Sequence, residues 1–435
     1  MAAVPNLALV PLGDVSKEAG RNREEVSLSK FRRDLGFVIA VAAACAVAAP
    51  ASAVAAPAPY TIDVMIPATG GAAFLGRGER IAANVLEKDV NAHGGIFGRP
   101  VHFRYFDTQS NPQTALQLVS QLKASHPVVI LGPSLVATCR AIAPLMKDGP
   151  VDYCFSPGIH PPSGSYAFSS TVSTHAVMSA MVRYLRLRGW TRIGVITSTD
   201  ASGEDGLNEL KKVLSEPANK DIKVVASKEF NPSAVSVSAE IERIKEAHPQ
   251  VLFSWSTGAP TATLFRNIED AGLDVPVVAG YGNMTYAQMK GYAKFLPKEL
   301  YFPAAEWPQT TPAQAKLAEI PQAVQKAKDE MYAAFKKAGA PPPDTAATLV
   351  WDSGRIVVEG LRKLGPKATP VQLRDYIAHL SGFAGINGVY DFTKHPQRGV
   401  GISDVVVTRW NAKADNWEIV SAPGGAPVHA AASAR

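Results

Sequence analysis

The stretch TRIGVITSTDASGEDGLNELKKVL, residues 191–214, decides how the rest of the sequence is interpreted. It begins with a mostly apolar run, RIGVI, typical of a buried strand, and ends in GLNELKKVL, where apolar residues recur at helical spacing. The loop between them, STDASGEDG (198–206), carries two glycines. Because a loop between a strand and a helix often cradles an anion, this strand–loop–helix unit raises the question of what its loop binds.

The same alternation of strand and helix runs through most of the chain. Patterns of the two kinds follow one another at YTIDVMIPA (60–68), LGRGERIAANVLEKDVNAHGG (75–95), RPVHFRYFD (99–107), PQTALQLVSQLKAS (112–125), PVVILG (127–132) and onward to VPVVAG (275–280). Strands separated by helices of this length require right-handed crossovers and therefore a parallel sheet. The units are too numerous for one compact sheet, so we expect an α/β protein with two lobes.

Three segments interrupt this rhythm. They are the small and polar SYAFSSTVSTHAV (165–177), the proline-containing YFPAAEWP (301–308), and AGINGVYDFTKHPQRG (384–399). We expect such breaks where the chain crosses from one lobe to the other. Residues 422–435 are small and polar, which predicts a flexible tail.

The N-terminus has the pattern of a secretory signal peptide. The basic SLSKFRRD (27–34) precedes an apolar run (35–50) that is too short for a comfortable membrane span, and ASA (51–53) fits a cleavage site. We therefore expect residues 1–53 to be removed on export to the periplasm. The basic region is unusually long, which favours a true translation start at Val26 or Leu28. Lipidation of Cys45 is disfavoured, because the residues before it lack the usual leucine.

Export leaves two cysteines, Cys139 and Cys154. An even pair in an exported protein predicts one disulfide bond.

Several function classes are excluded by what the sequence lacks. The net charge of +6 is spread along the chain without a basic block, which argues against a nucleic-acid partner. The sequence has no G-x-S-x-G elbow, no Walker A loop, no G-x-G-x-x-G opening a helix and no H-E-x-x-H. The histidines are not spaced like metal ligands, so we expect no metal site. Because these catalytic and cofactor motifs are absent, we also expect no cofactor and no enzymatic activity.

The loops that follow the predicted strands share one composition. They are rich in Gly, Ser and Thr, contain aromatic residues and carry few charges; they are GGAAFLG (70–76), GPSLVATC (132–139), SPGIHPPSG (156–164), STDASGEDG (198–206), SWSTGAPT (254–261) and GYGNMTY (280–286). In doubly wound sheets, ligands bind beyond the carboxyl ends of the strands. This composition favours gripping a small molecule through amides, hydroxyls and aromatic walls over proton-transfer catalysis.

The sequence resembles the periplasmic substrate-binding proteins of branched-chain amino-acid type ABC transporters. The resemblance covers roughly residues 60–420 and rests on segments that recur in order: DVNAHGGIFGRPVHFRYFD (89–107), VVILGPSLVATCRAIAPL (128–145), YCFSPG (153–158) and TAATLVWDSGRIVVEGL (345–361). It implies two Rossmann-like lobes with parallel sheets, joined by three crossing segments and closing on a ligand by a hinge. It further implies that lobe 1 comprises 60–172 with 307–390, and lobe 2 comprises 173–306 with 391–421.

The resemblance also implies positions for the ligand-binding residues of lobe 1. Phe74 or Leu75 stands where the family packs a large side chain on the ligand. The loop from Ser134 to Thr138 stands where backbone amides hold a ligand carboxylate, with Val136 in place of a frequent serine. After the SPG strand end, the corresponding residues are Gly158, Ile159 and His160.

In lobe 2 the sequence departs from the family pattern. Ser202 precedes Gly203 where the family usually has tyrosine, and Tyr281 and Asn283 stand where amino-acid binders place an acidic residue for the ligand ammonium. A buried ammonium without a carboxylate partner is costly. The shorter Ser202 enlarges the pocket, and Trp255 and Tyr281 can stack on a ring, which favours an aromatic or other amine-free organic acid. Asp200 and Glu204 keep an amino acid or its amide open as the alternative.

These observations predict a solute-binding protein of an ABC importer. We expect a monomer that captures a small organic acid, either an aromatic carboxylate or an amino-acid-like molecule, and delivers it to a membrane permease. The alternatives are transport of a branched-chain amino acid or amide, and ligand sensing by the same fold.

Overall fold

The computed structural model describes residues 57–305, 307–308 and 310–428. The predicted signal peptide, residues 1–53, lies outside the described residues. Within the described part of the chain, no helix is long and apolar enough to cross a membrane.

The first sheet has five strands, all parallel, in the order β2-β1-β3-β4-β5. The strands are β1 (Tyr60–Ile66), β2 (Val101–Asp107), β3 (Val129–Leu131), β4 (Val151–Cys154) and β5 (Ala167–Ser169). Adjacent β1 and β3 are in register at Asp63 opposite Ile130. The strand order reverses between β1 and β3, as it does at the ligand-binding crevice of doubly wound sheets.

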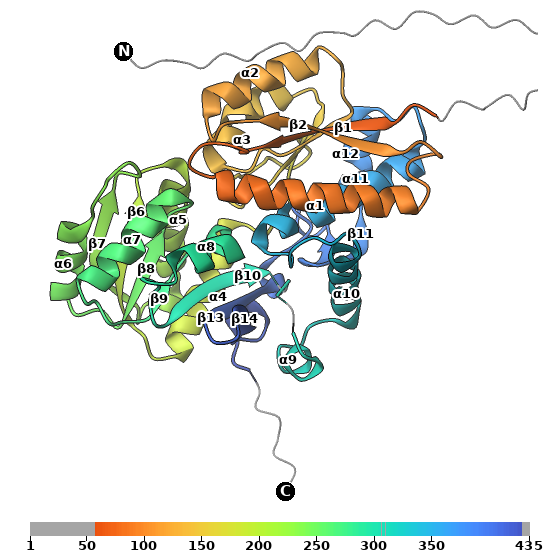
Figure 1. Cartoon of the computed structure of the whole chain (residues 1–435). Helices are drawn as coiled ribbons and strands as arrows, with labels where there is room; N and C mark the ends of the chain where they lie inside the picture. Colours follow the sequence, from red (N-terminus) through yellow and green to blue (C-terminus); the bar gives the residue numbers. More distant parts are fainter. Residues whose placement is uncertain (1–56, 306, 309, 429–435) are drawn as a thin grey trace, which may run out of the picture. The chain divides into compact units, whose positions relative to one another are not determined.

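Helices cover both faces of this sheet (Figure 1). One face packs on α2 (Pro112–Lys123) and α3 (Val136–Ile142), which bury Met65 and Ile130 in a small core of their own. The other face packs against α1 (Ala73–Ala92), α11 (Thr345–Leu364) and α12 (Pro370–Ala378), and α10 (Gln322–Lys337) packs on the outer side of α1. Coverage of both faces explains why the inner strands β1, β3 and β4 are buried along most of their length, whereas the edge strand β2 alternates buried and exposed residues.

The second sheet has seven strands in the order β14-β13-β10-β9-β8-β6-β7. The strands are β6 (Arg192–Ser198), β7 (Lys223–Phe230), β8 (Val251–Trp255), β9 (Val277–Val278), β10 (Leu300–Ala305), β13 (Val405–Asn411) and β14 (Asn416–Ile419). Strands β6 to β10 are parallel, whereas β13 and β14 add to the edge antiparallel. The order reverses between β6 and β8, so this sheet also has a switch point.

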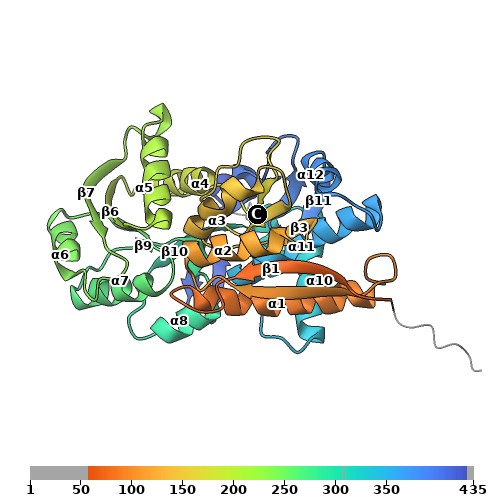
Figure 2. The ribbon, with the colours of Figure 1, turned by 90° about the horizontal axis from the view of Figure 1, so that it is seen from above.

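The helices of the second sheet surround its parallel part. They are α4 (Thr174–Leu187), α5 (Ala201–Leu214), α6 (Ser238–Glu246), α7 (Ala259–Asp270) and α8 (Tyr286–Tyr292). In both views α5, α6 and α7 lie around β6 and β7 (Figure 1, Figure 2). Side-chain caps start several of these helices: Ser173 caps α4, and Asp200 caps α5 by accepting from the amides of Ser202 and Gly203.

The chain passes between the two sheets three times. It leaves β5 for α4, leaves β10 for α9 (Pro312–Leu317) and α10, and leaves the hairpin β11 (Ser381–Gly385)–β12 (Gly388–Asp391) for β13. The prediction of an α/β fold with two lobes and three crossing segments is therefore confirmed. We propose the predicted ranges, 60–172 with 307–390 and 173–306 with 391–421, as lobe 1 and lobe 2.

The prediction of a flexible tail from residue 422 is wrong for its first residues. Ala422 pairs with Ala426, and the 3-10 turn Pro423–Gly425 packs on α4. Gly425 has a φ of 69°, and a side chain there would collide with the Ala180 carbonyl. The glycines allow the chain to lie directly on α4, which composition alone did not indicate.

Candidate functional site

The switch points of both sheets open on one cavity of about 350 Å³. Lobe 1 contributes the loops after β1 and β3, and lobe 2 contributes the loops after β6 and β8. The two lobes meet beside the cavity, where the Ala259 amide donates to the Gly71 carbonyl at 3.3 Å. Gly258 has a φ of 90°, and a side chain there would approach the Gly71 oxygen within 2.7 Å. Glycine is therefore required where the lobes touch.

The lobe 1 wall offers donors for an anion. Ser134, Leu135, Val136 and Ala137 line the cavity at the start of α3. The first amides of a helix have no acceptor within that helix, so those of Val136 and Ala137 are available to a ligand. The hydroxyls of Ser110 and Ser156 lie on the same wall.

A buried carboxyl supports this wall from behind. Glu79 is fully buried on α1, and the Ser134 hydroxyl donates to its Oε2 at 2.8 Å. Burial raises the pKa of Glu79 to about 8, with the hydrogen bond from Ser134 acting in the opposite direction. Nearby, desolvation raises the pKa of Asp344, the cap of α11, to about 7. Glu79 is therefore mostly protonated at neutral pH and does not repel an anion held at Ser134.

The lobe 2 wall begins at the loop STDASGEDG (198–206), which follows β6. Asp200 lines the cavity, and its Oδ1 accepts from Ser198 and from the amides of Ser202 and Gly203. The Ser202 hydroxyl bonds Thr257 at 3.0 Å, which joins the loops after β6 and β8. This loop is thus a helix cap whose short side chains leave space in the cavity.

Aromatic side chains form the inner end of the lobe 2 wall. Trp255 is 5% exposed, stacks on Phe253 with ring centres 5.7 Å apart, and lines the cavity. A side chain at Gly206 would lie 2.2 Å from the Trp255 ring, so this glycine fixes where the indole sits. Tyr281 also lines the cavity, and its hydroxyl bonds Thr171 at 2.9 Å.

Of the predicted ligand-binding residues, the structure brings six together on the cavity wall: Leu75, Ser134, Val136, Ser202, Trp255 and Tyr281. They come from both lobes.

The structure places the other predicted residues of lobe 1 away from the cavity lining. Half-buried Phe74 packs on the core, and Thr138 is buried with its hydroxyl on the Leu135 carbonyl. The carbonyl of Gly158 accepts from Arg140, and that of Ile159 accepts from the buried Arg398. These residues shape the loops without facing the cavity.

Three further predictions also lie off the wall. The His160 imidazole bonds Asp205 of α5 at 2.8 Å, so it meets the opposite lobe. A side chain at Gly203 would be 1.8 Å from the Ser198 carbonyl, so this glycine allows the helix to start close to β6. Asn283 is buried and accepts from the Gly258 amide, which positions the loop after β8.

The sequence interpretation missed several cavity residues. They include polar groups from both lobes and one apolar residue of α11, and they are Ser110, Ser156, Asp205, Thr257 and Leu349. Ser156 and Thr257 lay within the loops that were singled out, so strand-end position was a usable signal for them. Leu349 comes from a helix far along the chain, and no local pattern indicated it.

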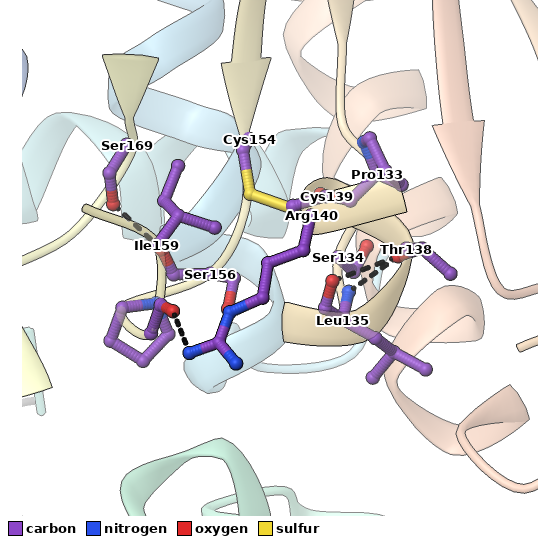
Figure 3. The surroundings of a disulfide bond; sticks show 12 residues. Pro133, Ser134, Leu135, Thr138, Cys139, Arg140, Cys154, Ser156, Ile159 and Ser169 are labelled. Atoms are coloured by element: carbon purple, nitrogen blue, oxygen red, sulfur yellow. Dashed lines mark hydrogen bonds between the residues drawn. A yellow bond between two sulfur atoms is a disulfide. The ribbon is translucent and has the colours of Figure 1, made fainter. Parts of the chain in front are cut away.

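Cys139 and Cys154 are joined by a disulfide, with Cα atoms 6.1 Å apart (Figure 3). The bond ties the first turns of α3 to the end of β4, and Ile159 packs on it. It therefore holds two of the loops that line the cavity.

The comparisons with known proteins agree with this geometry. Residues 59–415 match a family model described as periplasmic binding protein. No curated protein matches the chain. A type 1 periplasmic binding protein from Bordetella pertussis Tohama I is 23% identical with a TM-score of 0.69, over 83% of this chain and 99% of that one.

Two similar structures contain ligands. The branched-chain amino acid transporter substrate binding protein LivJ from Streptococcus pneumoniae, in complex with isoleucine, is 16% identical with a TM-score of 0.68, covering 83% of this chain and 99% of that one. An ABC transporter solute binding protein from R. palustris, in complex with benzoate, is 16% identical with a TM-score of 0.70, covering 86% of this chain and 98% of that one. At these identities the likeness establishes a shared fold.

Proposed function

Because the chain belongs to the periplasmic binding protein family, we propose that it is the extracytoplasmic solute-binding component of an ABC importer. It captures a small organic acid between its lobes and delivers it to a membrane permease. The observation that carries this proposal is the cavity between the two switch points, whose walls come from both lobes. A ligand held by both walls stabilises the closed arrangement, and a permease can recognise that arrangement.

The lining of the cavity supports an aromatic carboxylate as ligand. Among the described residues, no lysine, arginine, histidine or cysteine lines it. The carboxylate would therefore be held by the amides of Val136 and Ala137 and by serine hydroxyls, with the ring against Trp255. The benzoate complex of the R. palustris protein is consistent with this ligand class on the same fold.

One observation favours a second candidate, an amino acid. Asp200 and Asp205 both line the cavity, and Asp200 uses its Oδ1 for the helix cap. Its second oxygen is a possible partner for a ligand ammonium. The isoleucine complex of the Streptococcus pneumoniae protein shows that this fold serves such ligands. In either case we propose a monomer that acts in the periplasm.

A thermal-shift panel tests the proposal. Benzoates, cinnamates, aliphatic keto acids, branched-chain and aromatic amino acids, and amides would each be added to the purified protein. A ligand that binds only the folded form at a hundred times its Kd stabilises it by about 2.7 kcal/mol. We expect an upward shift of the melting temperature with an aromatic acid. A shift with leucine and none with any amine-free acid would replace the first candidate by the second, and no response to any of these compounds would refute the transport proposal.

A blocked cavity provides the control. Ser202→Trp fills the space that the short side chain leaves, so we expect the shift to disappear. Ser215→Trp introduces the same residue at the exposed end of the same helix and should keep the shift. A shift that persists in Ser202→Trp would mean that the compound does not bind in the cavity.

A further inference from the structure

A cluster of metal-ligating side chains lies where the two lobes meet, beside the cavity. His160 comes from the loop after β4 in lobe 1, and Asp205 and Glu209 come from one face of α5 in lobe 2. The imidazole Nε2 lies 2.8 Å from Asp205 Oδ1 and 3.9 Å from Glu209 Oε1. One donor atom from each of the three residues lies within 4.8 Å of the others.

The two carboxylates of this cluster are poorly hydrated. The side chains of Asp205 and Glu209 are 4% and 6% exposed, and they stand one helical turn apart, where like charges repel. Two cations pair with them directly, Arg140 with Asp205 at 3.0 Å and Lys212 with Glu209 at 2.6 Å, and the buried guanidinium of Arg398 attracts both carboxylates from farther away. The Arg140 and Lys212 side chains are 41% and 66% exposed, so both can swing into solvent and leave the carboxylates to another cation.

A fourth residue orients the cluster. His175 of α4 bonds Glu209 at its Oε2, 3.0 Å away, and this leaves Oε1 turned toward His160. A hydrogen bond to the outer oxygen of a ligating carboxylate is the usual way that proteins fix such a ligand. An imidazole with two carboxylates is a ligand set that suits zinc and other first-row divalent ions, with a remaining position for water or a fourth ligand.

We propose that His160, Asp205 and Glu209 form a binding site for a divalent transition metal, of which Zn²⁺ is the best fit, and that the ion bridges the two lobes. The ion replaces the charges of Arg140 and Lys212 on the carboxylates. Because its ligands come from both lobes, the ion binds most tightly when the lobes are together. If the cavity ligand also draws the lobes together, as the proposed function requires, each must raise the affinity of the other by the same factor.

Isothermal titration of tag-free protein with ZnCl₂ tests the site. We expect one ion per chain in the wild type and about tenfold or greater weakening in His160→Ala and in Glu209→Gln. His102→Ala is the matched control: His102 is an exposed histidine that lies 3.7 Å from Glu87, and its loss should leave the affinity unchanged. Circular dichroism confirms that each variant is folded.

One variant separates a metal site from a set of ion pairs. Lys212→Ala removes the cation that occupies Glu209 Oε1 without touching lobe 1, so it should tighten Zn²⁺ binding. The site is refuted if the wild type binds no equimolar Zn²⁺, or if His160→Ala binds it as tightly as the wild type. Equimolar binding that leaves the affinity for a cavity ligand unchanged would retain the site and refute the linkage. Failure of the transport proposal would instead appear as no ligand response in the presence or absence of Zn²⁺.

Discussion

The substitution Glu79→Gln tests how the wall behind Ser134 is stabilised. Glu79 is 0% exposed and accepts a hydrogen bond from Ser134 of the cavity lining. Glutamine has nearly the same shape, and its amide oxygen can accept from the Ser134 hydroxyl. The substitution removes the ionisable group and places an NH2 group where Oε1 has no hydrogen-bond partner among the described residues; only the loss of the ionisable group gives an effect on stability that depends on pH.

The magnitude follows from the pKa of Glu79, which rises from an ordinary 4.5 to about 8 in the folded protein. Between these pH values the folded protein holds a proton that the unfolded chain has released. The free energy of unfolding must therefore fall as pH rises, by about 1.4 kcal/mol per pH unit, and level off above about pH 8. The whole loss is at most on the order of 5 kcal/mol, since water entering the site relaxes the desolvation.

Asp344 must be separated from this effect. Its pKa rises from 3.8 to about 7, so its own contribution also lowers stability with rising pH, but it ends near pH 7. Because Asp344 itself raises the pKa of Glu79, and burial also raises the pKa of Asp152, the contribution of Glu79 is taken from the difference in slope between the wild type and Glu79→Gln. Below pH 7 both carboxyls contribute, and Glu79→Gln should remove only part of the slope.

Urea unfolding of the ligand-free protein at several pH values between about 5 and 9 measures the slope. We expect the wild type to lose stability between pH 7 and pH 8, and Glu79→Gln to lose much less and to be the more stable protein at pH 8. Glu242→Gln makes the same change on the exposed face of α6 and should keep the wild-type slope. Equal slopes in the wild type and Glu79→Gln would refute the reasoning.

Three further predictions concern the cavity and its disulfide. Trp255→Leu should weaken binding of an aromatic ligand about tenfold, and Gly206→Ala should do the same by displacing the indole, as measured by titration calorimetry. The double substitution Cys139→Ser with Cys154→Ser opens a loop with a sequence separation of 15 and should cost about 3 kcal/mol in urea unfolding; no change in the midpoint would contradict this. Asp200→Asn keeps a helix cap and should weaken an amino-acid ligand but not an amine-free acid, so a panel run on both proteins decides between the two classes.

The sequence was sufficient for the fold because its signals are local and repeated. Each strand–helix unit carries its own apolar pattern and its own ending, such as the glycines after α1, so many weak signals point to the same architecture. The tail was misjudged for the opposite reason. Gly424 and Gly425 look like a flexible end in composition, but they are small enough to lie against α4, and a fit to a distant surface is not a local property.

The candidate site was only partly predictable. The position of a loop at the end of a strand indicates that the loop lies near the ligand crevice, but it does not indicate which of its side chains face the cavity. Ser202 and Trp255 reach the cavity, whereas Gly203 and Asn283 hold the same loops from behind. His160 turns toward α5 of the other lobe. Its partners could not be found by ligand spacing, because they lie 45 and more residues away on another lobe.

Helix α5 connects the two sites of this molecule. Its cap, Asp200, and its first turn face the cavity, and Asp205 both lines the cavity and pairs with His160 and Arg140 of lobe 1. A movement that separates the lobes therefore breaks the ion pairs of Asp205 and opens the ligand wall at once. It follows that a change at Arg140 or His160, outside the cavity lining, alters ligand affinity through the position of α5. The loop STDASGEDG thus caps a helix whose next turn contacts the opposite lobe through the ion pairs of Asp205.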